Sequence, residues 1–285
     1  RHLRRSRAVE SVTTQMARAA RRLSARGSRC TLGGMRVLLV GYGSMGRELE
    51  RVLEARGHRI VSRVDPAGGG DQTALSAGTA SQAEVAIEFA HPSAVLENAR
   101  LYAQNGLNAV VGTTGWQDQR EQVAALVEQS DIAYLHGPNF SVGVHMFYRI
   151  VAAAARLVDR VDAYDVLAME MHHSRKKDSP SGTAHALAKL ILENVERKKR
   201  LVTQRLDRAI EPEELHFASV RGGNSPGQHG IILDSPADTI ELTHTARSRA
   251  GFALGAVLAA EWLPGRKGFL SVDSFVQDTL GDDKT

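Results

Sequence analysis

The sequence contains a single cysteine and no long apolar run. Because Cys30 is alone among 285 residues, the chain can form no internal disulfide and no cysteine-ligated metal cluster. A lone thiol is typical of a reducing compartment, so we expect a cytoplasmic protein. No stretch approaches the roughly 18 uninterrupted apolar residues that a membrane helix needs, and we therefore expect no membrane partner.

Acidic residues are nearly missing from the N-terminal segment. Residues 1–34 hold nine arginines, no lysine and one glutamate, which contribute +8 to the formal net charge of +4. The other 251 residues therefore carry −4, and we expect no nucleic-acid partner for this mildly acidic body. We expect residues 1–34 to be a flexible extension ahead of Met35. Their composition is also that of an organelle-targeting peptide, and a basic arm for nucleic acid is a third interpretation.

The rest of the chain has an ordinary globular composition. Apolar residues make up 42% and charged residues 24%, and 285 residues suffice for two domains. In the first half, short apolar runs alternate with helical segments, which predicts a doubly wound sheet. We expect an α/β fold with a Rossmann-type parallel sheet in residues 35–140, completed by a helix within 251–278. Residues 141–250 should form a C-terminal α+β domain with a mixed sheet, which serves substrate binding and oligomerisation.

A glycine motif between the first predicted strand and the first predicted helix indicates a dinucleotide site. The apolar run 36–40 leads directly into the motif G-x-G-x-x-G, and residues 47–56 have helical composition. In this context Gly41 permits a tight turn, Gly43 lets a pyrophosphate approach the backbone, and Gly46 allows the helix and strand to pack closely. The alternative is a glycine turn that binds no ligand.

Asp65 ends the second predicted strand, 19 residues after Gly46. An acid at this place accepts a hydrogen bond from the ribose 2′-OH of NAD and repels the 2′-phosphate of NADP, so we favour NADH over NADPH. Arg63 lies two residues earlier and is the residue that NADPH could recruit. The alternative is that Asp65 is only a turn residue at a strand end.

Three more loops follow predicted strands, at residues 89–92, 112–115 and 137–141. Ligands of open α/β sheets bind at the carboxyl ends of the strands, so we expect these loops to line the nicotinamide half of the cofactor. The loop at 112–115 has the sequence Gly-Thr-Thr-Gly, and its alternative role is a turn that caps the next helix.

Two adjacent histidines follow an alternating apolar run. Residues 164–171 predict a strand that delivers His172 and His173 at its end. Neighbouring side chains of a strand face opposite ways, and Glu170 shares a face with His172, whose ring it could orient. A metal site is the competing interpretation, but it needs further ligands at metal spacing, and the nearby Lys176 and Lys177 would repel a dication. We expect no metal.

A helix start follows the histidines. Ser179 and Pro180 fit the N-cap and first position of a helix. The N–H groups of Ser181, Gly182 and Thr183 would then be free at the positive end of the helix dipole, which suits a bound anion. Two lysines lie just before this anion seat. The combination of proton donors and an anion seat suggests a catalytic site for a substrate that carries carboxylates.

The remaining residues predict a mixed sheet and a returning helix. Residues 215–220, 230–233 and 239–243 have strand patterns, whereas 196–214 are expected to form an exposed linker or helix. The last strand is followed by three residues that could reach a substrate carboxylate or an interface, or could simply be exposed: His244, Arg247 and Arg249. The apolar helix 252–262 should return to the first domain.

These motifs together resemble the family of 4-hydroxy-tetrahydrodipicolinate reductases, also called dihydrodipicolinate reductases. From Glu170 to Ala184 the chain matches the family signature E-x-H-H-x-x-K-x-D-x-P-S-G-T-A. The family also shares the Gly-Thr-Thr-Gly loop, the segment 138–143, Arg221 with Gly-x-His at 227–229, and Glu-x-x-His at 241–244. The chain departs from the family in two places: the glycine motif is one residue shorter, and Ala90 stands where threonine is common.

The resemblance implies reduction of 4-hydroxy-tetrahydrodipicolinate, a small dicarboxylate, to tetrahydrodipicolinate in diaminopimelate and lysine biosynthesis. It implies His172 as an acid/base, Lys176 as a proton donor, and a homotetramer built by the C-terminal sheet. It implies substrate contacts at His173, Gly182 and Thr183. It implies cofactor contacts at Gly41, Tyr42, Gly43, Ser44, Met45, Gly46, Asp65, Gly112, Thr113, Thr114, Gly137, Pro138, Asn139 and Phe140.

Two other functions fit the same architecture. One is an NAD(P)-dependent amino-acid or amine dehydrogenase, which would not need the complete signature around His172. The other is a nucleotide-sensing Rossmann module without catalysis, whose second domain serves assembly only. The second alternative leaves the cluster of Lys176, Gly182 and Thr183 without a purpose.

Overall fold

A computed structural model of the chain describes residues 34–281. The predictions made for the Arg-rich segment 1–33 lie outside these described residues. The contact pattern divides the chain into two units: one runs to Ser141 and resumes at Ala250, and the other is Val142–Arg249. Among the described helices, none is long and apolar enough to cross a membrane.

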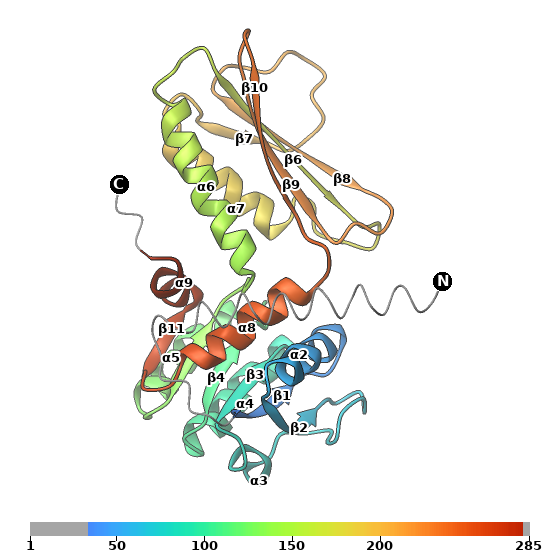
Figure 1. The fold of residues 1–285 in the computed structure, drawn as a ribbon, viewed down its shortest axis with the longest axis vertical. Coiled ribbons are helices and arrows are strands. Elements are labelled where there is room, and N and C mark those ends of the chain that lie inside the picture. The colour runs from blue at the N-terminus through green and yellow to red at the C-terminus, as the bar shows by residue number, and fades with distance from the viewer. Residues whose placement is uncertain (1–33, 282–285) are drawn as a thin grey trace. The chain divides into compact units, whose positions relative to one another are not determined.

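The first unit is built on a six-stranded sheet in which every pairing is parallel. Its order is β11-β5-β4-β3-β1-β2, so the chain starts in the interior of the sheet, moves to one edge and then returns to the other side (Figure 1). This doubly wound parallel sheet confirms the predicted Rossmann-type fold. The strands are β1 (Arg36–Val40), β2 (Arg59–Val64), β3 (Val85–Glu88), β4 (Asn108–Val111), β5 (Ala133–His136) and β11 (Gly268–Ser271).

Helices cover this sheet, which explains why its strands are continuous apolar runs. β1 is buried from Val37 onward, and β3 is buried throughout. Side chains of α4 and α5 form one core with the sheet, while α8 packs against α2, β3 and β4. The helices are α2 (Ser44–Ala55), α3 (Ala77–Ala80), α4 (Val95–Gln104), α5 (Arg120–Glu128), α8 (Ala250–Trp262) and α9 (Val272–Leu280), with 3-10 turns η1 (Pro92–Ala94) and η2 (Gln117–Gln119).

The C-terminal part of this unit differs from the predicted single helix in residues 251–278. It contains α8, then the short strand β11, then α9. β11 was not predicted because four residues after a Pro-Gly turn carry no periodicity of their own. Its strand conformation depends on pairing with β5, where Phe269 lies opposite Tyr134 and their rings stack with centroids 5.7 Å apart. The strand conformation of β11 therefore depends on a contact with a residue far away in the sequence.

The second unit has a five-stranded mixed sheet in the order β10-β9-β6-β8-β7, as the α+β prediction required. β6 pairs parallel with β8 and antiparallel with β9. Helices α6 and α7 lie side by side against one face and share a core with it (Figure 1). The elements are α6 (Val142–Val158), β6 (Asp165–His172), α7 (Gly182–Asn194), β7 (Arg200–Val202), β8 (Glu214–Arg221), β9 (Gln228–Asp234) and β10 (Thr239–Thr245).

The segment 196–214 is only in part the exposed linker that its charge suggested, because residues 203–213 are irregular and mostly exposed but the rest is not. It contains β7, and Lys198 within it is only 2% exposed. The ammonium of Lys198 lies 2.6 Å from the Asp165 carboxylate and donates to the carbonyl oxygens of Pro212 and Glu214, at 3.0 and 2.8 Å. A buried lysine needs such full coordination, and tertiary contacts of this kind leave no trace in the local sequence pattern.

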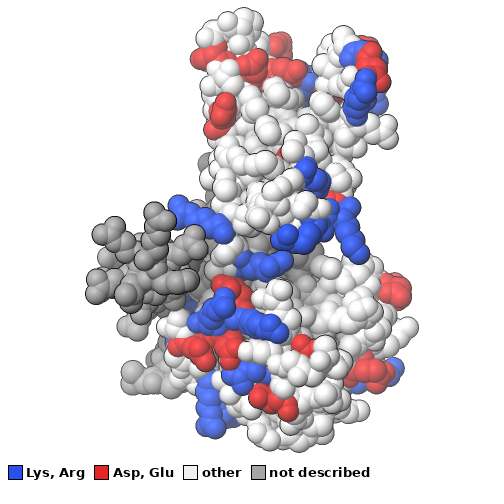
Figure 2. All heavy atoms as spheres, turned by 90° about the vertical axis from the view of Figure 1, so that its right-hand side faces the viewer, with Lys and Arg blue, Asp and Glu red and all other residues white. Residues whose placement is uncertain are grey.

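Charges of both signs occur on the face of the molecule in Figure 2. Lys and Arg lie among Asp and Glu there, as the near balance of charge after residue 34 predicts. Several Lys and Arg side chains gather near the middle of that view, and Asp and Glu are more frequent above and below them.

The small residues of α8 allow close packing. A Cβ added at Gly255 would overlap the carbonyl oxygen of Phe140, whereas a Cβ at Gly251 would meet the Ser141 hydroxyl at an ordinary 3.6 Å. The far end of the helix is held by Glu261, which accepts from the Arg56 side chain at 2.6 Å.

We therefore expect Gly255→Ala to lower the free energy of unfolding by about 3 kcal/mol, because backbone must move to make room for the new carbon. Chemical denaturation of both variants measures this. Gly251→Ala, on the same helix, is the control and should be neutral or slightly stabilising. Equal stability of the two variants would contradict the packing described.

Candidate active site

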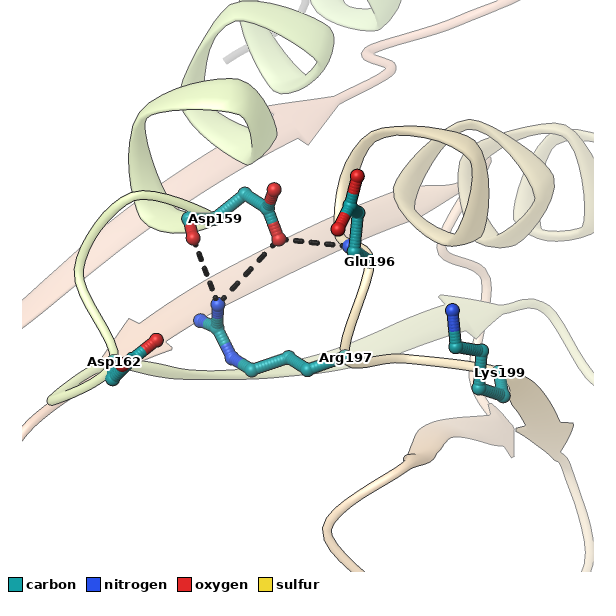
Figure 3. Close-up of a pocket in the computed structure, with 5 residues that line it drawn as sticks. All are labelled: Asp159, Asp162, Glu196, Arg197 and Lys199. Atoms are coloured by element: carbon teal, nitrogen blue, oxygen red, sulfur yellow. Dashed lines mark hydrogen bonds and ion pairs between the residues drawn. The ribbon is translucent and has the colours of Figure 1, made fainter.

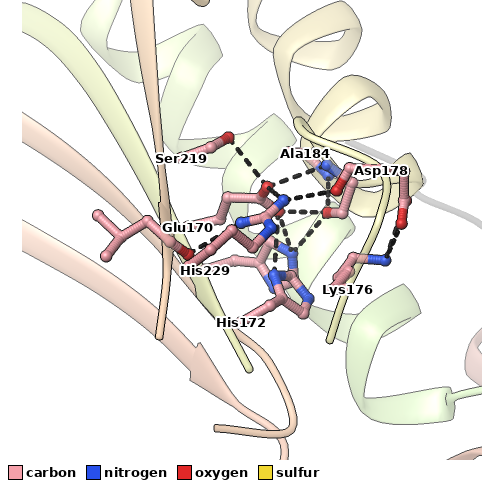
Figure 4. A network of polar contacts seen from close by, with 10 residues as sticks. Glu170, His172, Lys176, Asp178, Ala184, Ser219 and His229 are labelled. Atoms are coloured by element: carbon pink, nitrogen blue, oxygen red, sulfur yellow. Dashed lines mark hydrogen bonds and ion pairs between the residues drawn. The ribbon is translucent and has the colours of Figure 1, made fainter. Parts of the chain in front are cut away.

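The centre of the second unit is the buried carboxylate of Glu170 on β6. Its side chain accepts hydrogen bonds from the Ser181 backbone N–H at 3.0 Å, the Ser219 hydroxyl at 2.9 Å and Arg221 Nη2 at 2.6 Å (Figure 4). The Ser181 hydroxyl also donates to it. His229 Nε2 lies 3.4 Å away. The donors come from three elements, so this carboxylate on β6 joins the ends of β6, β8, β9 and α7.

These contacts keep Glu170 ionised. Burial opposes a charge on this carboxyl, but the hydrogen bonds from His229, Ser181 and Arg221 outweigh it and hold the pKa of Glu170 well below its usual range. Glu170 is therefore a fixed anion rather than a group that exchanges protons near neutral pH.

His172 lies at the end of β6, next to this anion. Its Nδ1 is 3.4 Å from a Glu170 oxygen, and its ring meets the His229 ring edge-on with centroids 5.1 Å apart. Gly227 closes the other side, because a Cβ there would lie 2.9 Å from His172 Nε2. Burial lowers the pKa of His172 to about 4 in spite of the attraction of Glu170. The ring is thus neutral at physiological pH.

Lys176 is the cation beside this neutral ring. Its ammonium contacts both oxygens of Asp178, at 2.8 and 2.9 Å, and its side chain is only partly exposed. Lys177 is exposed to solvent. The two lysines, which look equivalent in the sequence, therefore have different surroundings.

The start of α7 lies two residues later than predicted. Ser181, not Ser179, is the N-cap, and its hydroxyl accepts from the Ala184 N–H at 3.1 Å. Ser179 and Pro180 precede the helix and are joined by a cis peptide bond. The prediction failed because Ser-Pro and Ser-Gly both fit a helix start locally, and only the bond from Ser181 to Glu170 selects the second.

Two backbone N–H groups remain at the anion seat. The Ser181 N–H is not free, because it donates to Glu170. In the described part of the chain, the N–H groups of Gly182 and Thr183 have no protein acceptor, and nothing lies within 4 Å of a Cβ built on Gly182. This open helix N-terminus suits a carboxylate. Burial raises the pKa of Tyr148 on α6, and the nearby Thr183 side chain opposes this rise.

Two further histidines, His173 and His244, were considered for this site. His173 is anchored by its backbone N–H, which donates to the Ser225 carbonyl at 2.9 Å, and its Nδ1 is buried without a partner. His244 pairs with His229 across β10 and β9 and its ring lies 5.8 Å from Phe147. Burial lowers the pKa of His244. Arg247 and Arg249 follow β10 and are exposed.

Sequence reasoning assigned no role to Ser181's side chain, Ser219 or His229. The register of the sheet brings them together: Glu170 lies opposite His229 on β9 and opposite Ser219 on β8. Strand pairing cannot be read from one sequence, so no local signal could have found Ser219, whereas the family resemblance already marks His229 within Gly-x-His at 227–229.

A metal is the competing occupant of this network. Ligand atoms of Glu170, His172 and His229 lie within 4.8 Å of one another. However, both histidines approach Glu170 Oε2, and Arg221 Nη2 lies 2.6 Å from Oε1 of the same carboxylate. A guanidinium at that distance repels a dication, so the arrangement favours an anionic ligand near Lys176.

A hollow at another place in this unit is less suited to catalysis. It has a volume of about 360 Å³ and is lined by Asp159, Asp162, Glu196, Arg197 and Lys199 (Figure 3). Arg197 already donates to the carbonyl oxygens of Val158 and Tyr164, at 3.2 and 2.6 Å, and the Glu196 N–H donates to Asp159 at 2.7 Å. These polar groups hold the ends of α6 and α7 together.

In the first unit, the glycine motif has the geometry that a dinucleotide needs. Gly41 has φ +89°, and a Cβ there would overlap the Phe89 carbonyl oxygen. Gly46 lies against the Gly41 carbonyl oxygen, so helix and turn pack closely. Nothing lies within 4 Å of a Cβ built on Gly43, which caps the N-terminus of α2. This open backbone fits a pyrophosphate.

Asp65 lies next to this motif. It accepts from the Tyr42 N–H at 3.2 Å and from the Ala67 N–H at 2.9 Å. Arg63, the residue considered for NADPH, is engaged elsewhere, because it donates to Glu50 at 2.9 Å and to Asp71 at 3.1 Å. The carboxylate of Asp65 is thus fixed at the place where a ribose is expected, without an ion pair from Arg63.

The remaining predicted cofactor residues differ in their exposure to solvent. Ser44, Thr114 and Pro138 are exposed, and Tyr42, Met45, Gly112 and Asn139 are half-buried. Thr113, Gly137 and Phe140 are buried. Thr113 and Phe140 have buried side chains and Gly137 has none, so these three residues support the loops and offer a ligand backbone groups only.

Comparison with known proteins identifies the family. Family models for the N-terminus and the C-terminus of dihydrodipicolinate reductase match residues 35–140 and 143–276. The chain belongs to the dihydrodipicolinate reductase family. A 4-hydroxy-tetrahydrodipicolinate reductase from Christiangramia forsetii is 36% identical over 86% of this chain and 98% of its own length. One from Archaeoglobus fulgidus is also 36% identical, over 85% of this chain and 100% of its length.

A solved structure of the same family shares the fold. The dipicolinate-bound dihydrodipicolinate reductase from Paenisporosarcina sp. TG-14 superposes with a TM-score of 0.66, at 24% identity, over 84% of this chain and 97% of that one. A probable dehydrogenase from Thermotoga maritima gives a TM-score of 0.53 at 8% identity, over 86% and 94% of the two chains. The Rossmann-type architecture therefore extends beyond the dihydrodipicolinate reductase family.

The neutrality of His172 can be measured by NMR. Its ring should stay neutral between pH 5 and 8 and titrate with a midpoint of about 4, because burial outweighs the attraction of Glu170. The exposed His185 on α7 provides the comparison signal.

The lowered pKa of His172 should also reduce the free energy of unfolding as the pH falls below 6.5, because the unfolded chain then binds a proton that folded His172 does not bind until about pH 4. A His172 midpoint at 6.5 would contradict this description.

Proposed function

We propose that this chain reduces 4-hydroxy-tetrahydrodipicolinate to tetrahydrodipicolinate with NADH or NADPH, as a step of diaminopimelate and lysine biosynthesis. The observation that carries the proposal is the network around Glu170, which combines a cationic proton donor, a neutral imidazole and an open helix N-terminus. The family match supports it over both units. The proposed alternatives, an amino-acid dehydrogenase and a nucleotide sensor, use neither Lys176 nor the free N–H groups of α7.

The substrate is a ring with two carboxylates. Overall, it takes up a hydride and a proton and loses water. The nicotinamide supplies the hydride when it is bound. The N–H groups of Gly182 and Thr183 bind one carboxylate, and His173 contacts the other. Charge-assisted hydrogen bonds of this type are about twice as strong as neutral ones, and they orient the ring.

Lys176 donates the proton to the ring carbon. Because burial keeps His172 neutral, an imidazolium is not available at neutral pH, whereas the Lys176 ammonium is held in place by Asp178. His172 serves as a neutral hydrogen-bonding partner, oriented by the fixed charge of Glu170 and by Gly227. The roles of the two predicted acid/base residues therefore differ.

Lys176→Ala should reduce kcat by roughly 10²- to 10⁴-fold, the usual contribution of general acid catalysis, while the affinity for NADH stays within about twofold. The assay follows NADH absorbance with the aldol product of pyruvate and aspartate semialdehyde as substrate. Lys177→Ala is the matched control and should retain full activity. No turnover by the unmodified chain would refute the proposed reaction, and an active Lys176→Ala variant would refute only the role of Lys176.

NADH is the cofactor that we favour, because the Asp65 carboxylate lies beside the glycine motif, where a ribose is expected to bind, and Arg63 is bound to Glu50 and Asp71. Asp65→Ala should raise the ratio of kcat/KM for NADPH over NADH by about tenfold, since repulsion of the 2′-phosphate is removed. Asp118→Ala, an exposed acid of the same unit, is the control. An unchanged ratio would show that Asp65 does not contact the ribose.

A homotetramer is proposed from the open face of the second sheet. Opposite the helices, this face exposes Leu167 (41%), Met169 (43%) and Val220 (46%), which lie on adjacent strands. Contiguous exposed apolar side chains mark interaction surfaces, and the same face of a second copy offers a matching apolar surface.

Leu167→Glu should dissociate the assembly, because a charge would be buried in the apolar interface. Light scattering of the purified full chain should give the mass of four chains for the unmodified protein and a smaller mass for the variant. Leu157→Glu places the same charge on the exposed side of α6 and should leave the mass unchanged. A monomeric unmodified chain would reject the tetramer.

A further inference from the structure

A second buried carboxyl lies beneath the predicted nicotinamide loops of the first unit. Glu88 is the last residue of β3, and its side chain is fully buried. No lysine, arginine or histidine of residues 34–281 forms an ion pair with it. Burying a carboxyl without a cation is costly, and a position at the carboxyl end of a strand, where ligands of such sheets bind, suggests a functional reason.

The contacts of Glu88 are neutral donors. The Tyr102 hydroxyl on α4 donates to Oε2 at 2.7 Å. Asn98 on α4 and Thr113 face the same carboxyl and stabilise its charged form. Oε1 has no hydrogen bond of normal geometry. This carboxyl is therefore only partly satisfied, in contrast to Glu170.

Thr113, whose side chain favours the charged form of this carboxyl, joins two loops. Its hydroxyl accepts from the Ala90 N–H at 2.9 Å, which joins the loop after β3 to the loop after β4. The Thr113 carbonyl oxygen accepts from the Trp116 indole at 2.8 Å, and the Gly112 N–H donates to the Glu88 carbonyl oxygen at 2.9 Å. Because the residue at position 90 is alanine, it has no hydroxyl of its own for this link, and Thr113 alone provides it.

We infer that Glu88 is a positioning residue: through Thr113, its buried carboxyl holds the loops after β3 and β4 in the conformation that receives the nicotinamide end of the cofactor. The inference rests on the proposed use of NADH or NADPH. Glu88 does not touch the cofactor in this account, since its side chain is enclosed by α4 and the sheet.

The protonation state of Glu88 follows from its surroundings. Burial raises its pKa to about 7, and the hydrogen bonds from Tyr102, Asn98 and Thr113 oppose this rise. Tyr102 and Tyr134 are the titratable groups that face it among the described residues, and burial raises the pKa of both well above the usual value. His91, farther along the same loop, contacts Ser93 instead.

Ionisation should therefore loosen the loops. A conformation that exposes the carboxyl to water restores a lower pKa, so loop opening becomes more favourable as the pH rises through 7. Because ionisation of Glu88 and opening of the loops are linked, NADH should bind more weakly at pH 8 than at pH 6, by at most about tenfold.

The test measures NADH affinity of the full chain by ligand fluorescence at pH 6 and pH 8, without substrate. Glu88→Gln keeps the shape and the bond from Tyr102 but cannot ionise, so its affinity should be independent of pH and close to that of the unmodified protein at pH 6. Glu97→Gln, an exposed acid on α4, is the control and should keep the pH dependence. A circular dichroism melt checks that both variants fold.

Thr113→Val is the second variant, because it removes the link and leaves Glu88 in place. It should weaken NADH binding at both pH values. Equal pH dependence in Glu88→Gln and the unmodified protein, or unaltered binding by Thr113→Val, would overturn the inference. Failure of the unmodified chain to bind either NADH or NADPH would instead refute the proposed function, so the two failures are distinguishable.

Discussion

The ion pair between Glu170 and Arg221 is the interaction on which the catalytic half of this protein depends. A carboxylate with no exposed surface is unstable unless its charge is matched and its oxygens are hydrogen-bonded. Here Arg221 supplies the charge, and Ser181 and Ser219 supply further donors. Arg221 and Ser219 lie near the end of β8, Ser181 lies at the start of α7, and Glu170 itself lies near the end of β6. The need to satisfy one buried charge therefore fixes where β6, β8 and α7 end relative to one another.

The hydrogen bonds of Glu170 also determine which groups stay free at the proposed substrate site. Glu170 uses its hydrogen-bonding capacity within the protein, so it does not compete with the substrate for the free N–H groups of α7. Ser181 shows the division most clearly: its own N–H serves Glu170, whereas the next two N–H groups remain open. Lys176, the proposed proton donor, is held by a different acid, Asp178, which is exposed.

The sequence predicted the elements that depend on local pattern and missed those that depend on pairing. β1 and β2 were bounded correctly, because an apolar run followed by glycine or aspartate ends a buried strand unambiguously. The strand β11 and the true cap of α7 were missed, since each is selected by a distant partner, β5 and Glu170. The predicted site residues around His172 came from a contiguous signature, whereas His229 and Ser219 join it only through strand register.

Two buried carboxyls of this chain, Glu170 and Glu88, illustrate how the surroundings decide the function of the same chemical group. Glu170 has a guanidinium at 2.6 Å, and its pKa lies far below neutrality, so its charge is permanent. Glu88 has only neutral donors, and its pKa of about 7 allows both protonation states under physiological conditions. A permanent charge suits a site whose geometry must not vary during proton transfer. A carboxyl that can lose its charge suits loops that must admit and release a dinucleotide, because its ionisation biases them toward the open form.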